Sequence, residues 1–72
     1  MSFSEDIKDI RQQSLLSQAA FAEALGVSFS TVNRWETGKT LPTYKAMKSI
    51  ELFCQEHEID FGGSKKAWKE EK

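Results

Sequence analysis

The sequence has too few cysteines and too few apolar runs for a disulfide-stapled or membrane-spanning protein. It contains 1 cysteine, Cys54, among 72 residues, which excludes an internal disulfide framework and fits a reducing cytoplasm. No apolar run approaches the roughly 18 residues that a membrane span requires. The acidic start, with Glu5, Asp6 and Asp9, is unlike a signal peptide. These absences predict a cytoplasmic protein without a membrane segment.

The sequence also lacks the residue clusters that catalysis or metal binding requires. Cys54 and His57 have the spacing of one edge of a metal site, but two ligands do not close a zinc site. Glu56, His57, Glu58 and Asp60 cluster without a nucleophile or a glycine-rich loop nearby. We therefore expect no enzyme activity, no metal, no cofactor and no small-molecule ligand.

The overall charge is slightly acidic, yet its distribution along the chain is uneven. The net charge is −1, whereas DNA affinity comes mostly from Lys and Arg. Residues 28–48 nevertheless carry a net charge of +3, from Arg34, Lys39, Lys45 and Lys48 against Glu36. Acidic segments flank this block on both sides. Since local distribution matters more than the total, a folded domain can present one basic face.

Apolar spacing and capping residues predict a small all-α domain. A chain of this length makes at most one domain, which should be a compact bundle of four to five helices. The first helix is expected over residues 4–14, with Ser4 as its cap, and Ser17, Ser28 and Thr43 are expected to cap the next three. These run to about Leu25, Glu36 and His57, and glycines at 26 and 38 end the second and third. No strand pattern and no internal repeat is present.

The charged segment after residue 61 is expected to lie outside the folded domain. Gly62-Gly63-Ser64 is typical of a flexible break, and the residues after it are mostly charged. We therefore predict a domain over 1–61 and a flexible tail or linker over 62–72. Trp68 in this tail has three alternative roles: it covers a gap in the core, docks on a partner, or lies in solvent.

The most informative segment runs from Gln18 to Glu36. Phe21, Leu25, Val32 and Trp35 are the apolar positions that two short, steeply crossing helices would bury, and Gly26 permits the tight turn between them. The third helix then directs Ser28, Phe29, Ser30, Thr31, Asn33 and Arg34 outward. Most of these are hydrogen-bonding side chains of the kinds that contact base edges and phosphates.

These residues resemble the phage Cro/repressor-type, or XRE-like, helix-turn-helix family. The resemblance rests on SQAAFAEALGVS at 17–28, TVNRWETGK at 31–39 and Pro42, and it extends over roughly residues 4–60. It implies a lambda-repressor-like domain whose third helix enters the major groove of double-stranded DNA. It also implies a bacterial or phage transcription regulator, often a repressor, that works as a homodimer on paired half-sites.

The resemblance also implies roles for particular residues. Gln18 would contact a phosphate, and Lys39 lies in the loop that contacts phosphate. Phe29, Ser30, Asn33 and Arg34 occupy the positions that contact bases, with Ser28 and Thr31 beside them. Arg11 would lie opposite Glu36, and we expect a direct, partly buried salt bridge there. For dimer formation we expect the far side of the fourth helix and the segment around Ile59 and Phe61.

Two features keep other functions open. Phe29 either touches a thymine methyl group or belongs to a protein interface. The acidic composition and Phe29 together favour a protein-interaction module that has lost DNA binding. A further alternative is the DNA-targeting module of a larger system, such as an antitoxin or the regulatory part of a modification enzyme.

Overall fold

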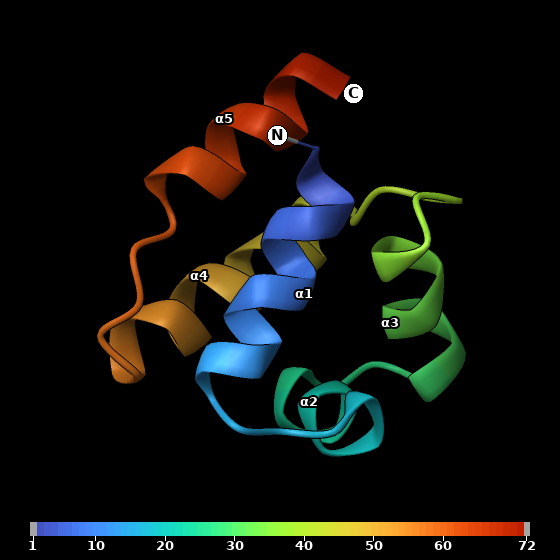
Figure 1. Ribbon diagram of the computed structural model, residues 1–72, viewed down its shortest axis with the longest axis vertical. Helices are drawn as coiled ribbons and strands as arrows, with labels where there is room; N and C mark the ends of the chain where they lie inside the picture. The colour runs from blue at the N-terminus through green and yellow to red at the C-terminus, as the bar shows by residue number, and fades with distance from the viewer. Residues whose placement is uncertain (1, 72) are drawn as a thin grey trace.

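The computed structural model describes residues 2–71, which form five α-helices and, within that range, no strand (Figure 1). The helices are α1 (Phe3–Gln13), α2 (Gln18–Leu25), α3 (Phe29–Glu36), α4 (Tyr44–Glu56) and α5 (Gly62–Glu71). The all-α class is confirmed, and the five helices agree with the four to five that the sequence predicts. None of the helices is long and apolar enough to cross a membrane.

Side-chain caps start the helices, three of them at the residues that the sequence predicts. At the starts of α2, α3 and α4, the hydroxyl groups of Ser17, Ser28 and Thr43 each accept a hydrogen bond from the backbone N–H of the residue three positions later. The cap expected at Ser4 is wrong, because α1 begins at Phe3 and the Ser2 hydroxyl accepts the N–H of Glu5. Phe3 is completely buried, so packing of its ring draws the first turn further toward the N-terminus.

One hydrophobic core joins all five helices. Phe21 of α2 and Phe53 of α4 meet edge to face within it, with ring centroids 5.2 Å apart. The expected burial of Phe21, Leu25, Val32 and Trp35 is confirmed, and Val27 packs against the same cluster from the turn. Because α2 and α3 both bury side chains in this core, their packing against it sets the angle between the two helices.

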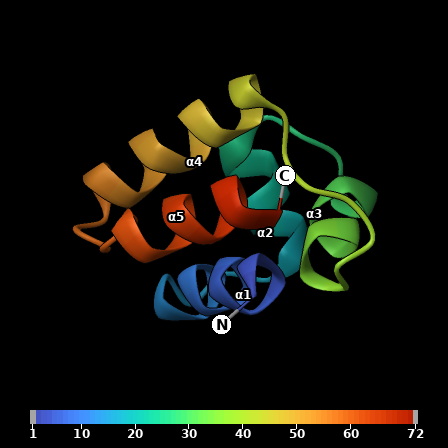
Figure 2. The same cartoon turned by 90° about the horizontal axis from the view of Figure 1, so that it is seen from above.

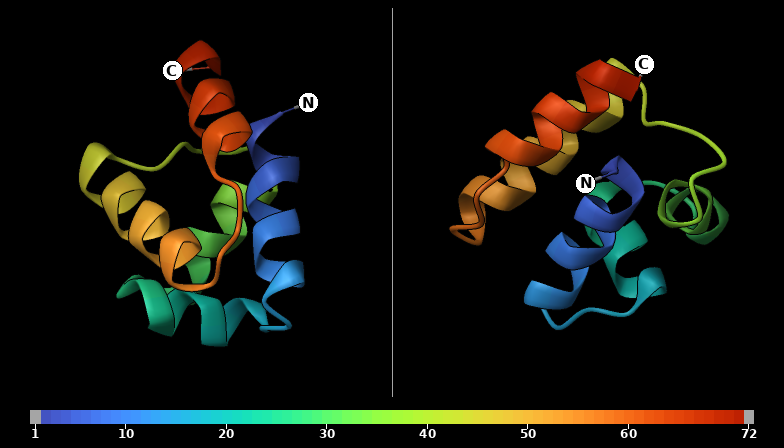
Figure 3. Two further views of the ribbon diagram at one scale, coloured as in Figure 1. Left: turned by 90° about the vertical axis from the view of Figure 1, so that its left-hand side faces the viewer. Right: turned by 45° about the horizontal axis from the view of Figure 1, so that its top comes forward.

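Residues 62–71 form a packed helix, so the flexible tail expected there is wrong. Figure 2 shows α5 between α4 and α1, and the right-hand view of Figure 3 shows it running alongside α4. Trp68 is 4% exposed, and its indole Nε1–H donates to the Pro42 carbonyl over 2.8 Å. Of its three alternative roles, Trp68 therefore covers the core. Burial of this ring and of Ala67 outweighs the low helix propensity of the two glycines at the start of α5.

The segment between α4 and α5 folds back onto the core. Phe61 is 8% exposed, and Ile59 packs against the core while partly buried. The expectation that Phe61 forms part of a pairing surface is therefore wrong, since its ring is already used within the domain.

Candidate nucleic-acid interface

Three residues, Gly26, Val27 and Ser28, separate α2 from α3. Gly26 ends α2 in the left-handed conformation, with φ of 74°, and the N–H of Val27 donates to the Ala22 carbonyl over 2.9 Å. A β-carbon at Gly26 would meet nothing within 4 Å. The glycine is therefore required by the backbone conformation and not by lack of space. After this turn, Ser28 caps α3 at once.

The outward side of α3 carries most of the predicted contact residues. Val32 and Trp35 are 0% and 3% exposed and hold the helix against the core. On the other side, Ser30 and Arg34 are exposed, Asn33 is half-buried, and Phe29 is 53% exposed. In Figure 1, α3 lies at the right-hand edge of the molecule, on the opposite side from α4 and α5. This surface is accessible to a long, regular partner such as a duplex.

A small hydroxyl cluster occupies the first turn of α3. The Ser28 hydroxyl lies 2.7 Å from that of Thr31 and 3.3 Å from that of Ser30. It also accepts the backbone N–H of Thr31 over 3.2 Å. Ser28 and Thr31 thus stabilise the helix start within the protein, while Ser30, which is also exposed, accepts or donates only one bond in this cluster.

Arg11 and Glu36 form a bidentate ion pair between α1 and the end of α3, as expected. Arg11 Nε donates to Glu36 Oε2 over 2.7 Å, and Nη2 donates to Oε1 over 3.1 Å. The side chains are only 15% and 3% exposed. The hydrogen bonds that Arg11 donates to the Glu36 carboxylate raise the pKa of Arg11 above its ordinary value. A third bond, from Nη1 to the Leu16 carbonyl over 2.9 Å, ties the α1–α2 turn to the same group.

The ion pair continues through two amide side chains toward the outward side of α3. Gln18 Nε2 donates to Glu36 Oε1 over 3.1 Å, and Asn33 Nδ2 donates to Gln18 Oε1 over 3.4 Å. These contacts orient both carboxamides. One N–H and the Oδ1 of Asn33 have no partner within the described chain. Sequence reasoning missed this chain of contacts because Gln18 and Glu36 lie 18 residues apart and no local spacing joins them.

Arg34 and Lys39 supply the positive charge of this surface. Both are exposed, and neither forms an ion pair with any residue of 2–71. The backbone N–H of Lys39 donates to the Arg34 carbonyl over 2.9 Å, and Gly38 before it has φ of 77°. The loop after α3 is therefore closely tied to the end of the helix. Lys39 lies beyond that end, whereas Arg34 lies on the helix itself.

Comparison with known proteins finds similarity to helix-turn-helix proteins. The profile of a helix-turn-helix family matches residues 7–61. The chain is 36% identical over 53 residues to the HTH-type transcriptional activator BcrR of Enterococcus faecalis. The match covers 74% of this chain and 26% of the activator, so the chain spans about a quarter of that relative. No solved structure gives a significant match.

Proposed function

Because the chain belongs to the XRE-type helix-turn-helix family of DNA-binding transcription regulators, we propose that it recognises double-stranded DNA by placing α3 in the major groove. One observation carries the proposal. The buried side of α3, with Val32 and Trp35, leaves Ser30, Asn33 and Arg34 on the side away from the core. Side chains of these types donate to and accept from base edges. Such a protein would act on cytoplasmic DNA of a bacterium or phage.

Asn33 and Arg34 are the proposed sequence-reading residues. The available N–H and Oδ1 of Asn33 match adenine, which presents one acceptor and one donor in the major groove. The Gln18 contact supports this role because it orients the Asn33 amide before DNA arrives. The Arg34 guanidinium matches the two acceptors of guanine. Ser30 and the exposed Phe29 ring lie one turn earlier, where a hydroxyl contact and a thymine methyl contact complete the surface.

Gln18 and Lys39 are the proposed phosphate contacts, with Ser28 and Thr31 beside them at the helix start. Gln18 is the first residue of α2, where backbone N–H groups have no partner within the helix and attract anions. Its second side-chain N–H remains for a phosphate, since the first donates to Glu36. Lys39 extends the positive charge past the end of α3. Contacts of this kind position the protein without selecting a sequence.

A dimer on two half-sites is part of the proposal. One short helix offers few base contacts, and paired half-sites one helical turn apart double them. Sedimentation should detect two copies on the selected duplex. A single copy, both free and on that duplex, would contradict the dimer but not DNA recognition.

Selection from random duplexes at low and moderate salt tests the function. Enrichment of one motif supports the regulator, and uniform, salt-sensitive binding indicates a general DNA module. Absence of binding at low salt favours the protein-interaction module, a second candidate that the 53% exposure of Phe29 supports. The quarter-length match to the activator supports a third candidate, a DNA-targeting module of a larger protein.

A further inference from the structure

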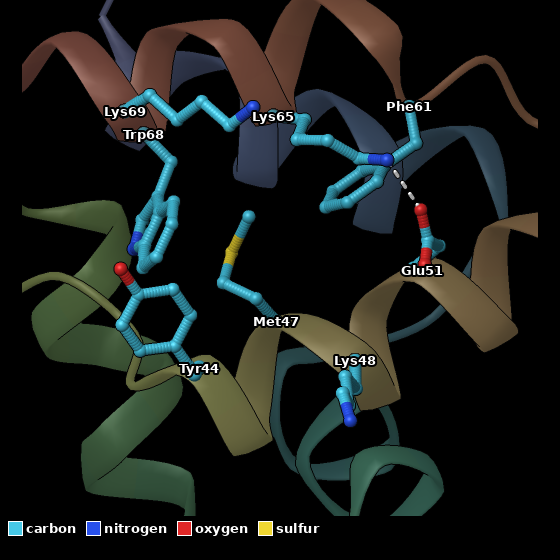
Figure 4. Close-up of a pocket in the computed structure, with 8 residues that line it drawn as sticks. All are labelled: Tyr44, Met47, Lys48, Glu51, Phe61, Lys65, Trp68 and Lys69. Atoms are coloured by element: carbon cyan, nitrogen blue, oxygen red, sulfur yellow. Dashed lines mark ion pairs between the residues drawn. The ribbon is translucent and has the colours of Figure 1, made fainter.

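An apolar hollow lies between α4 and α5, away from the proposed DNA surface. Its volume is about 180 Å³. Figure 4 shows Met47 at its centre, with Trp68 and Tyr44 on one side and Phe61 on the other. A cavity of roughly 150 Å³ is enough to bind benzene. The hollow therefore has room for one ring-sized or branched apolar side chain.

Lysines surround this hollow. Lys48, Lys65 and Lys69 line it together with a single acidic residue, Glu51. Lys65 pairs with Glu51 over 2.6 Å, shown as the dashed line in Figure 4. Neither Lys48 nor Lys69 forms an ion pair within residues 2–71. An apolar site with this excess of positive charge favours an occupant that is apolar at its centre and acidic at its edges.

The outer face of α4 extends the apolar surface. Tyr44 and Leu52 are 66% and 59% exposed, and Lys48 lies between them at helical spacing on the same row. Two exposed apolar groups on either side of a lysine suit an amphipathic segment better than a small free molecule. A second copy of this chain is disfavoured at this face, because a symmetric contact would bring the same lysines against one another. The dimer proposed on paired half-sites is therefore expected to pair through another surface.

We propose that the hollow between α4 and α5 docks an acidic, amphipathic peptide segment of another protein, with one bulky apolar side chain inserted among Tyr44, Met47, Phe61 and Trp68. The site does not depend on DNA binding. Since α3 lies on the opposite side of the molecule from α4 and α5 (Figure 1), the segment can dock while α3 is occupied. Lys48 and Lys69 attract its acidic residues, and the hollow selects its anchor.

Titration of the ¹⁵N-labelled protein with three blocked peptides tests the proposal. The probe is acetyl-Glu-Asp-Phe-Glu-Asp-amide, and the controls replace Phe by Ser or all four acids by Lys. We expect saturable shifts confined to the hollow, including the Trp68 indole N–H. Affinity should fall by about tenfold with Ser, since the buried ring supplies most of the contact. The basic peptide should not saturate.

Variants of the lysines provide the matched control. K48E combined with K69E should weaken the probe by about tenfold. K66E reverses one lysine charge on α5, the helix that carries Lys69, at a position that does not line the hollow, and it should change affinity less than about twofold. The unshifted amides of each variant report that the fold is intact.

Four results would overturn the proposal: no saturable binding of the probe, equal binding of the basic peptide, shifts centred outside the hollow, or full affinity in the double variant. Signals of the hollow that change on dilution without peptide would also overturn it, by identifying the occupant as a second copy.

Discussion

Among single residues, Glu36 connects stability most directly to the candidate interface. Both of its carboxylate oxygens are used, Oε2 by Arg11 and Oε1 by Arg11 and Gln18. Its side chain is 3% exposed, so water cannot replace a lost partner. The same carboxylate orients Gln18, which in turn contacts Asn33. A change at this pair therefore reaches both the core and the outward side of α3.

Arg11→Leu should lower the free energy of unfolding by about 3 kcal/mol, because it leaves the Glu36 carboxylate buried without a cationic partner. Urea unfolding measures the loss. Glu23→Gln, on an exposed position of α2, is the control and should change stability by less than about 0.5 kcal/mol. Equal stability of the two variants would show that the ion pair does not hold α1 to α3.

Alanine variants on the DNA surface should separate base contacts from phosphate contacts. Asn33→Ala and Arg34→Ala should each weaken the selected duplex by about 1–3 kcal/mol, with a much smaller effect on scrambled DNA. Lys39→Ala should weaken both duplexes alike and reduce the salt slope by roughly one. Salt titrations of affinity provide the measurement. Equal losses on both duplexes for all three variants would mean that α3 does not read the sequence.

The thiol of Cys54 predicts a pH dependence of stability. Burial raises its pKa from 9.0 to about 11, so the native state holds the proton more tightly than the unfolded chain does. This contribution is complete below pH 9 and is lost as the pH rises to about 11, by up to about 2–3 kcal/mol. Urea unfolding at pH 8 and pH 10.5 should show a smaller loss for Cys54→Ala. Identical losses in the two proteins would contradict the prediction.

Among the elements, the starts of α2, α3 and α4 could be predicted from sequence because they depend on local chemistry. Ser17, Ser28 and Thr43 cap them through bonds to nearby backbone N–H groups. α5 was missed because its stability comes from distant contacts. Local propensity at Gly62 and Gly63 opposes a helix. The position of Trp68 is instead fixed by its ring contact with Tyr44 of α4 and its hydrogen bond to the Pro42 carbonyl. The sequence does contain one signal for α5, because the residues that become buried recur at helical spacing: Phe61, Ser64, Ala67 and Trp68.

The candidate site likewise has features that local sequence predicts and features that depend on tertiary packing. The outward residues of α3 follow from the buried positions of Val32 and Trp35 by helical geometry alone. The ion pair of Arg11 with Glu36 was expected from family resemblance. The contacts of Gln18 with Glu36 and Asn33 depend on how α2 and α3 cross, which is set by the core and not by any local spacing.

Two glycine substitutions, one just after α2 and one within α5, should have opposite effects on the stability of the protein. Gly26→Ala should destabilise the protein by about 1 kcal/mol or more, since alanine disfavours φ of 74°. Gly63→Ala should stabilise it by about 0.5 kcal/mol, because residue 63 is helical and its β-carbon would meet nothing within 4 Å. Thermal unfolding of both variants checks this. Stabilisation by Gly26→Ala would show that the turn tolerates another conformation.

For the whole molecule, α5 closes the bundle by covering α1 and α4 together (Figure 2). The backbone N–H of Phe3 donates to Glu71 Oε2 over 2.5 Å, which joins the first and last helices directly. The two proposed surfaces then lie on opposite sides, with α3 on one side and the hollow beside α5 on the other. Loss of α5 would remove the hollow and uncover the core at once.

Trp68→Ala should therefore destabilise the entire domain, by about 3–5 kcal/mol. Trp68→Phe keeps a ring in the core but loses the bond to the Pro42 carbonyl, and it should cost less. Lys66→Ala, on an exposed position of the same helix, is the control. Hydrogen exchange should show faster exchange in α1 as well as α5 for Trp68→Ala. Faster exchange confined to α5 would indicate that this helix is not part of the cooperative unit.

The contact between Phe3 and Glu71 also has a consequence during synthesis. The two residues are 68 positions apart, and at about 5–20 residues per second the ribosome needs roughly 3 to 14 s to make the second after the first. An isolated helix forms in about a microsecond. The apolar residues of the α1 segment, Phe3, Ile7 and Ile10, therefore wait seconds on the nascent chain before α5 exists to cover them.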